Sequence, residues 1–196
     1  MTGRRSVGAI MFLLLPAMLV VTGAQPASSA TAVRSAVPSV CLHPARRGFK
    51  PLTAAGKHVG KSVRVLAMGR GPGRVPLPPP LTTSGKNSFA WDKYGPKPGS
   101  ARGNVRFNAH TYPDGSALGN RLLKRLQVGN RIILYGSGVA LCYKVTKRIV
   151  TTPRRLGSYY SLIGSPKLAI VVCSGVRLGP GNWTKRTIWY AKPSTS

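Results

Sequence analysis

Short apolar runs, separated by glycine- and proline-rich segments, limit this chain to a fold made mainly of β-strands. The segment Val105–Ala109 alternates between apolar and polar residues, and Leu168–Cys173 has the length and composition of a buried strand. Only Ser116–Gln127 has the periodicity of an amphipathic helix. Many short strands with one good helix favour a closed or nearly closed β-barrel. Further strands are expected at 62–66, 131–135, 139–146 and 186–191.

The predicted helix carries its leucines on one face, because they recur at spacings of four and three residues. Asp114 or Ser116 can cap its start, and Gly129-Asn130 is suited to end it. The leucines of this face are Leu118, Leu122, Leu123 and Leu126.

Acidic residues are scarce: thirty lysines and arginines stand against Asp92 and Asp114 alone. A glycosidase with two catalytic carboxylates would need both aspartates in one site. An oxygen-ligand cage for calcium or magnesium is nearly excluded, and an Asp-His-Ser relay would depend on one of these two residues. Composition therefore removes several classes of enzyme before any motif is considered.

Residues 1–30 have the features of a leader, either a secretory signal peptide or an N-terminal membrane anchor. Arg4 and Arg5 precede an uncharged stretch, 6–33, whose most apolar part is 7–21. Small residues at 28–30 suit cleavage of a signal peptide. Because the arginines precede the apolar stretch, we expect the N-terminus inside and the rest of the chain outside the cytoplasm, associated with the membrane or secreted.

The rest of the chain is expected to form a tether followed by one domain. Residues 31–61 lack periodicity and contain several prolines and basic residues, which indicates a flexible basic tether. The domain is then predicted at 62–193. Such basicity alone suits a nucleic-acid binder, but the leader argues against nucleic acid as a partner. An exported basic protein can instead meet anionic lipids or phosphate-bearing wall polymers.

Three side chains have the chemistry of thiol acyl transfer. The strand-like run 168–173 ends in the thiol of Cys173, and Arg186 follows thirteen residues later, far enough for a loop and a return strand. His110 directly follows the alternating segment 105–109. A nucleophile, a proton donor and a cation are therefore expected at the ends or edges of strands.

The sequences around these side chains resemble those of sortases. Segment 108–120 resembles the histidine segment of that family, 168–175 its cysteine strand and 183–191 its arginine strand, in the same order. The Ala-His-Thr and Val-Val-Cys-Ser sequences are most similar to actinobacterial class F sortases, with class E next. The resemblance covers about residues 103–193 and is weak from 62 to 102.

The resemblance implies a sortase-like closed β-barrel of about seven to eight strands with one or two short helices. It implies a cysteine transpeptidase that cleaves a Leu-Pro-any-Thr-Gly sorting signal between threonine and glycine. Cys173 would form a thioester, His110 would act as general acid, and Arg186 would hold the substrate backbone or the developing oxyanion. The partners would be surface proteins with this signal and an amine of a peptidoglycan precursor or pilin.

Further site residues are predicted from their positions beside this trio. Thr111, Ser174 and Trp183 are candidates for contact with substrate. Many sortases have threonines where this chain has Ala169 and Val172, so a hydroxyl contact there is not carried over. The acidic loop residues with which some sortases bind calcium are missing, and no cofactor is expected.

Three other readings of the sequence stay open. A papain-like triad would need Asp114 or Asn108 to orient the imidazole. A sortase fold without turnover would keep the barrel and lose the reaction. A non-catalytic exported basic module would bind anionic cell-wall polymers or lipid, and this binding would weaken steeply with salt.

The odd number of cysteines raises the question of a disulfide. A nucleophile plus one pair would account for Cys41, Cys142 and Cys173, so a bond between Cys41 and Cys142 is one hypothesis. A buried free thiol at Cys142 is the alternative. Cysteine and histidine are not clustered as in a zinc site, and Cys41-Leu42-His43 alone is weak evidence. Both His43 and His58 are expected in the tether.

Overall fold

The computed structural model describes residues 39–41 and 47–195 of this 196-residue chain. These residues belong to a compact unit, Ala36–Ser196, whereas the unit Met1–Ser35 lies outside the described residues. The predicted leader at 1–30 and His43 therefore also lie outside them. None of the helices within the described ranges has the length and apolar character needed to cross a membrane.

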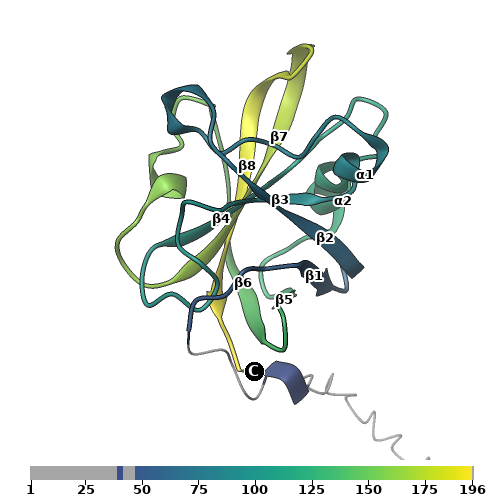
Figure 1. The fold of residues 1–196 in the computed structure, drawn as a ribbon. Helices are drawn as coiled ribbons and strands as arrows, with labels where there is room; N and C mark the ends of the chain where they lie inside the picture. Colours follow the sequence, from purple (N-terminus) through teal and green to yellow (C-terminus); the bar gives the residue numbers. More distant parts are fainter. Residues whose placement is uncertain (1–38, 42–46, 196) are drawn as a thin grey trace, which may run out of the picture. The chain divides into compact units, whose positions relative to one another are not determined.

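Eight strands and two short α-helices form the regular structure of the described residues (Figure 1). The strands are β1 (Thr53–Gly56), β2 (Gly60–Met68), β3 (Phe89–Asp92), β4 (Asn104–Ala109), β5 (Arg131–Tyr135), β6 (Ala140–Thr151), β7 (Lys167–Gly179) and β8 (Asn182–Pro193). The helices are α1 (Thr83–Lys86) and α2 (Leu118–Arg125), with 3-10 turns η1 (Ser39–Cys41), η2 (Pro72–Arg74) and η3 (Gly157–Tyr160).

The strands close into a barrel in the order β1-β2-β3-β4-β7-β8-β6-β5, because β5 pairs with β1. Neighbouring strands are antiparallel except for β2 with β3 and β4 with β7, which are parallel. A parallel pair needs a long connection between its strands, and these connections carry α1 and α2. The predicted closed, mainly β barrel of seven to eight strands with one or two short helices is confirmed.

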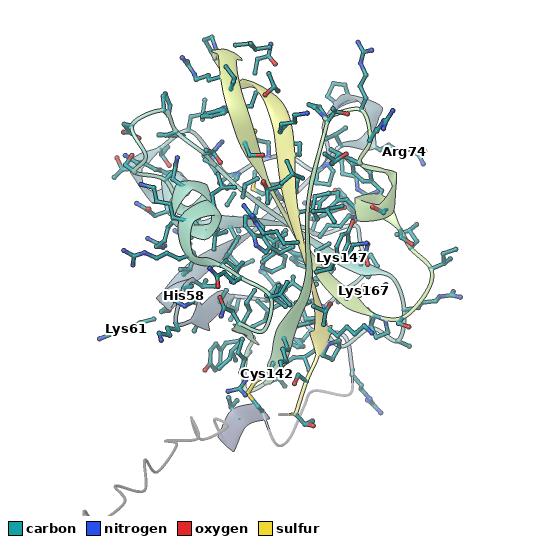
Figure 2. The ribbon with its side chains drawn as sticks, turned by 180° about the vertical axis from the view of Figure 1, so that it is seen from behind. His58, Lys61, Arg74, Cys142, Lys147 and Lys167 are labelled. Carbon is teal, nitrogen blue, oxygen red and sulfur yellow. A yellow bond between two sulfur atoms is a disulfide. The ribbon has the colours of Figure 1, made fainter. Side chains whose placement is uncertain are left out.

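The barrel begins earlier than the sequence analysis expected. Strand β1 starts at Thr53, inside the segment predicted as tether, and pairs with both β2 and β5. Ala54 and Val59 are fully buried. Small residues dominate 53–60, so this part of the wall has too few large apolar side chains to show a strand pattern in the sequence. His58 consequently lies in the turn between β1 and β2 rather than in a tether (Figure 2).

Helix α2 is shorter than the predicted 116–127, because Ala117 is its N-cap residue and Leu126 its C-cap residue, and Asn120 lies in its first turn. The side-chain oxygen of Asn120 accepts hydrogen bonds from the backbone N–H groups of Ala117 and Tyr112. Asp114 instead accepts from the backbone and hydroxyl of Ser116, within the preceding turn. The buried leucine face is as predicted, except that Leu123 is only partly buried: Leu118, Leu122 and Leu126 lie in the core.

A disulfide joins Cys41 of η1 to Cys142 of β6, with the two Cα atoms 5.3 Å apart (Figure 2). The hypothesis drawn from the odd cysteine count is therefore confirmed. Cys173 is left as the free thiol of the three cysteines. The bond closes a loop of 101 residues, which attaches the N-terminal segment to the barrel wall.

Side chains alternate between the two faces of each strand, so the core has two parts. The barrel interior holds Phe107 of β4, Ile170 and Val172 of β7, and Trp189 of β8. Trp189 donates its indole N–H to the carbonyl oxygen of Leu126, which fixes the end of α2. A smaller cluster lies on the opposite face of β7 and β8, where η3 packs: Tyr159, Ala169, Ile188 and Tyr190.

Candidate active site

Strand alternation places the three candidate catalytic residues on one face of three adjacent strands. Cys173 of β7 lies directly opposite Arg186 of β8, and Ala109 of β4 lies opposite Val172. Because Val172 points into the barrel, Cys173 points outward. His110 follows the last residue of β4, one position beyond the Ala109–Val172 pair. All three side chains line one cavity of about 530 Å³.

Two segments outside the barrel form the walls of this cavity. The proline-rich loop between η2 and α1 contributes Val75, Pro76, Pro78 and Leu81. The turn around η3 contributes Leu156, Tyr159 and Tyr160 on the other wall. The cavity is therefore a groove over the outer face of β4, β7 and β8, lined largely by apolar and aromatic side chains as in many ligand sites.

The thiol of Cys173 is partly buried in this groove. Burial raises its pKa above the ordinary value because the charged thiolate is less well solvated there, and the nearby Arg186 lowers the pKa in part. Desolvation is the larger effect. The protein without ligand therefore holds Cys173 mainly as the neutral thiol at neutral pH.

The imidazole of His110 is held by the proline-rich loop. Its Nε2 atom lies 2.7 Å from the carbonyl oxygen of Pro79. A carbonyl oxygen can only accept a hydrogen bond, so Nε2 carries the proton and donates it. Two residues earlier, the side-chain amide of Asn108 donates to the carbonyl oxygen of Leu77 at 3.2 Å. The loop is thus hydrogen-bonded to alternate residues at the end of β4.

The guanidinium of Arg186 is oriented by backbone carbonyls. Its Nη1 donates to the carbonyl oxygens of Trp183 and Lys185, both at 2.9 Å. A guanidinium has five N–H donors, so three remain for a ligand. The two aspartates of the chain pair with other cations, so neither neutralises Arg186.

The three residues predicted to contact substrate have different surroundings. Thr111 lines the cavity, and its hydroxyl donates to the carbonyl oxygen of Cys173 at 2.8 Å. This bond attaches the segment that contains His110 and Thr111 (the histidine turn) to β7. Trp183 also lines the cavity. Ser174 is buried outside the lining, and its hydroxyl accepts a hydrogen bond from Thr187. The structure thus gives Ser174 a role in packing β7 against β8.

Gly119 of α2 is a residue of the site that the sequence analysis missed. Its backbone N–H donates to the carbonyl oxygen of His110 at 2.7 Å. A Cβ atom at this position would overlap that carbonyl and would lie 2.6 Å from the hydroxyl oxygen of Thr111. Only glycine lets the helix approach the histidine turn this closely. The glycine occurs in the predicted helix start, and nothing in its local sequence distinguishes it from a turn residue.

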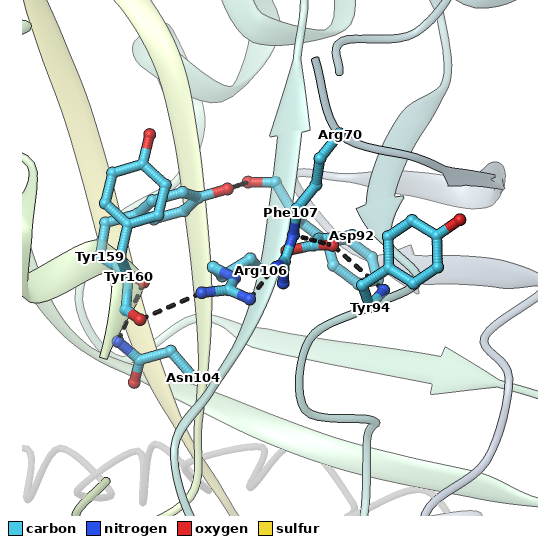
Figure 3. Close-up of polar contacts among 8 residues, drawn as sticks. All are labelled: Arg70, Asp92, Tyr94, Asn104, Arg106, Phe107, Tyr159 and Tyr160. Carbon is cyan, nitrogen blue, oxygen red and sulfur yellow. Dashed lines mark hydrogen bonds and ion pairs between the residues drawn. The ribbon is translucent and has the colours of Figure 1, made fainter. Parts of the chain in front are cut away.

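A buried ion cluster supports the wall formed by η3 (Figure 3). The carboxylate of Asp92 pairs with Arg70 at 2.9 Å and with Arg106 at 2.8 Å. Arg106 also donates to the carbonyl oxygen of Tyr160 at 3.0 Å, and Asn104 donates to that of Ser158 at 2.7 Å. Strand β4 therefore holds the turn that carries the cavity-lining tyrosines.

Metal-binding groups do not gather in the described part of the chain, where no three histidine, cysteine, aspartate or glutamate side chains form a cluster. The disulfide removes Cys41 and Cys142 as ligands. The cluster around Asp92 is occupied by two guanidinium groups.

The fold is similar to that of solved sortases. Sortase C1 of Streptococcus agalactiae, solved as a complex with MTSET, aligns with a TM-score of 0.53 at 14% identity, over 72% of this chain and 65% of that one. Sortase C1 of Streptococcus suis aligns with a TM-score of 0.53 at 14% identity, over 74% of this chain and 73% of that one. The sortase D5 transpeptidase of Clostridium perfringens aligns with a TM-score of 0.50 at 17% identity, over 74% of this chain and 78% of that one.

At these identities the similarity establishes the sortase fold and not the reaction. The chain spans just under two thirds of the length of the S. agalactiae structure. No protein-family model matches the sequence, and neither does any curated protein.

Proposed function

We propose that this protein is a sortase-type cysteine transpeptidase, related to the actinobacterial class F or class E enzymes. The observation that carries the proposal is the convergence of His110, Cys173 and Arg186 on one groove of a sortase fold. The groove is open and is lined largely by apolar and aromatic side chains, which suits an extended peptide. The substrate would be a surface protein ending in a Leu-Pro-any-Thr-Gly sorting signal.

The first half-reaction would form a thioester on Cys173. The thiolate attacks the threonine carbonyl carbon, and the sulfur–carbon bond forms as the carbon–nitrogen bond to glycine breaks. Protonated His110 gives its proton to the departing glycine amine. The peptide carbonyl oxygen carries negative charge in the tetrahedral intermediate, and the remaining donors of Arg186 could stabilise it or hold the substrate backbone.

The second half-reaction would transfer the acyl group to an amine of a peptidoglycan precursor or a pilin. The amine nitrogen attacks the thioester carbon, the sulfur–carbon bond breaks, and the thiolate is restored. The proton released by the amine returns to His110. An acceptor of this kind requires the export that the N-terminal sequence predicts, with the domain outside the cytoplasm.

The electrostatics of the groove predict a slow enzyme. Burial raises the pKa of Cys173, whereas the reaction needs its thiolate together with a protonated His110. Only a minor population of molecules has the thiolate at neutral pH.

The proposal is tested with the full chain in neutral detergent and a fluorogenic Leu-Pro-any-Thr-Gly peptide, with hydroxylamine as acceptor. Slow cleavage and a peptide hydroxamate are expected, because hydroxylamine intercepts a thioester. Cys173→Ala should abolish both, and Arg186→Ala should lower the rate by about a hundredfold or more. Arg177→Ala is the matched control, since Arg177 lines the groove but is not paired with Cys173. Wild-type rates in Cys173→Ala would rule out the mechanism.

A further inference from the structure

A second cavity, of about 520 Å³, lies on the same outer face of the barrel, beyond η3. The turn separates the two cavities: Tyr159 and Tyr160 line the groove of Cys173, and Ser158 and Ser161 line the second cavity. The sheet side of the second cavity comes from β4, β6, β7 and β8: Asn104, Thr146, Lys147, Ile149, Lys167, Tyr190 and Lys192.

Three lysines surround this cavity, each on a different strand of the sheet. Lys147 lies on β6, Lys167 on β7 and Lys192 on β8, and Figure 2 labels the first two. The register brings further positive charge close, since Lys192 lies directly opposite Lys144. Like charges in directly opposed positions repel. A bound anion would reduce this repulsion between lysines.

The chain has no carboxylate side chain left to neutralise these lysines. Its two acidic residues are Asp92 and Asp114. Asp92 is buried between Arg70 and Arg106, and Asp114 lies 3.6 Å from Lys86. Each ammonium has three donors and no acceptor, and neither aspartate is paired with these lysines, so ions or a ligand must supply their counter-charge.

The floor of the cavity is fixed by internal hydrogen bonds. Asn104 is almost fully buried and donates to the carbonyl oxygens of Ser158 and Tyr159. The hydroxyl groups of Ser158 and Tyr190 are hydrogen-bonded at 2.8 Å, and Thr146 donates to the carbonyl oxygen of Tyr190. The neutral polar groups are therefore largely paired with one another, and the lysines supply the unpaired donors.

We propose that this cavity binds an anion carrying two or more phosphate groups, such as a diphosphate or a run of phosphodiesters in a polymer. Lysine serves as a point-charge ligand for phosphate and does not require the planar pairing that arginine makes with carboxylates. Three lysines match a multiply charged ligand, and the volume falls in the ordinary range for small-ligand sites. The proposal does not depend on the chemistry of Cys173.

The first test titrates inorganic tripolyphosphate into the full chain in neutral, phosphate-free detergent, measured by calorimetry at low salt. Lys147→Gln/Lys167→Gln/Lys192→Gln should weaken binding by about tenfold or more. Lys57→Gln/Lys61→Gln/Lys124→Gln removes the same charge from exposed lysines elsewhere and should change binding by less than about threefold. Equal weakening by both triple variants would mean general attraction to a basic protein and would overturn the site.

The second test uses the unaltered chain and so does not depend on the folding of variants. Lysines are acetylated with and without tripolyphosphate, and their modification is quantified by mass spectrometry. Selective protection of Lys147, Lys167 and Lys192 supports the site, and uniform protection overturns it. Protection by phosphatidylglycerol vesicles without protection by tripolyphosphate would indicate a membrane surface instead. Cys173→Ala should bind tripolyphosphate normally, which separates this proposal from the transpeptidase proposal.

Discussion

Nε2 of His110 lies 2.7 Å from the carbonyl oxygen of Pro79, so the ring nitrogen nearest the proline-rich loop is engaged by that loop and not by Cys173. The proton on Nε2 must leave this contact before that nitrogen can serve a departing amine. The loop also lines the groove where a peptide would lie. Its displacement is therefore expected to accompany substrate binding.

Loosening this loop should accelerate the reaction. Pro78→Gly/Pro79→Gly removes two of the residues that stiffen the backbone, which makes the contact with His110 easier to break. We expect kcat/KM for the sorting-signal peptide to rise by about threefold to tenfold, worth on the order of 1 kcal/mol. Pro72→Gly is the control, because Pro72 lies in the same connection but does not line the groove. An unchanged or lower rate in the double variant would show that the loop contact does not limit the reaction.

The thiol of Cys173 should titrate above the ordinary value of a free cysteine, about 8.5, because burial outweighs the effect of Arg186. The thiolate is the charged form, so a neighbouring cation stabilises it, and loss of that cation raises the pKa further. Iodoacetamide alkylation of Cys173, followed from pH 6 to 10, measures this pKa. In Arg186→Ala the curve should move to higher pH, with alkylation near neutral pH slowed by up to about tenfold. Arg177→Ala should leave the curve in place; a shift toward lower pH in Arg186→Ala would contradict the assignment.

Close approach of α2 to the histidine turn predicts a large effect from one methyl group. Gly119→Ala places a Cβ against the carbonyl oxygen of His110 and the hydroxyl of Thr111, so the turn must shift. A displacement of this size at a proton donor should lower kcat by about tenfold to a hundredfold, with a smaller loss of stability of about 1–3 kcal/mol. Gly157→Ala, where the added Cβ meets no atom within 4 Å, is the control. Peptide cleavage and thermal unfolding of both variants separate the two effects.

Local patterns sufficed to predict most strands of the barrel and to place the candidate residues at the ends or edges of strands. Alternation in 105–109 indicates which side chains of this strand face inward, so the outward position of His110 follows from it. The run 168–173 is apolar throughout, so the outward position of Cys173 is known only from the structure. Alternation along β8 places Arg186 on the same outer face as Cys173. What parity could not supply is the strand order that makes β4, β7 and β8 neighbours.

Features that depend on contacts between distant segments were not predictable. The segment 53–60 forms part of the barrel through its pairing with β2 and β5, although its small residues give no strand pattern. The contact of Pro79 with His110 joins residues 31 positions apart. Asp92 stood out as one of two acids, but its partners Arg70 and Arg106 could not be distinguished among thirty basic residues.

The buried Asp92 should be the more important of the two aspartates for stability. Its side chain is fully buried between two guanidinium groups, so Asp92→Asn leaves the buried Arg106 and the partly buried Arg70 without their counter-charge. Removing one partner of such a cluster costs about 3–5 kcal/mol, which should lower Tm by about 10 °C. The turn held by the hydrogen bond from Arg106 to Tyr160 should loosen as well. The rate of peptide cleavage should therefore be lower even at temperatures where the variant is still folded. Asp114→Asn is the matched control, since Asp114 is exposed, and its Tm should stay close to that of the unaltered protein. Equal Tm values for the two variants would show that the ion cluster does not hold the groove wall.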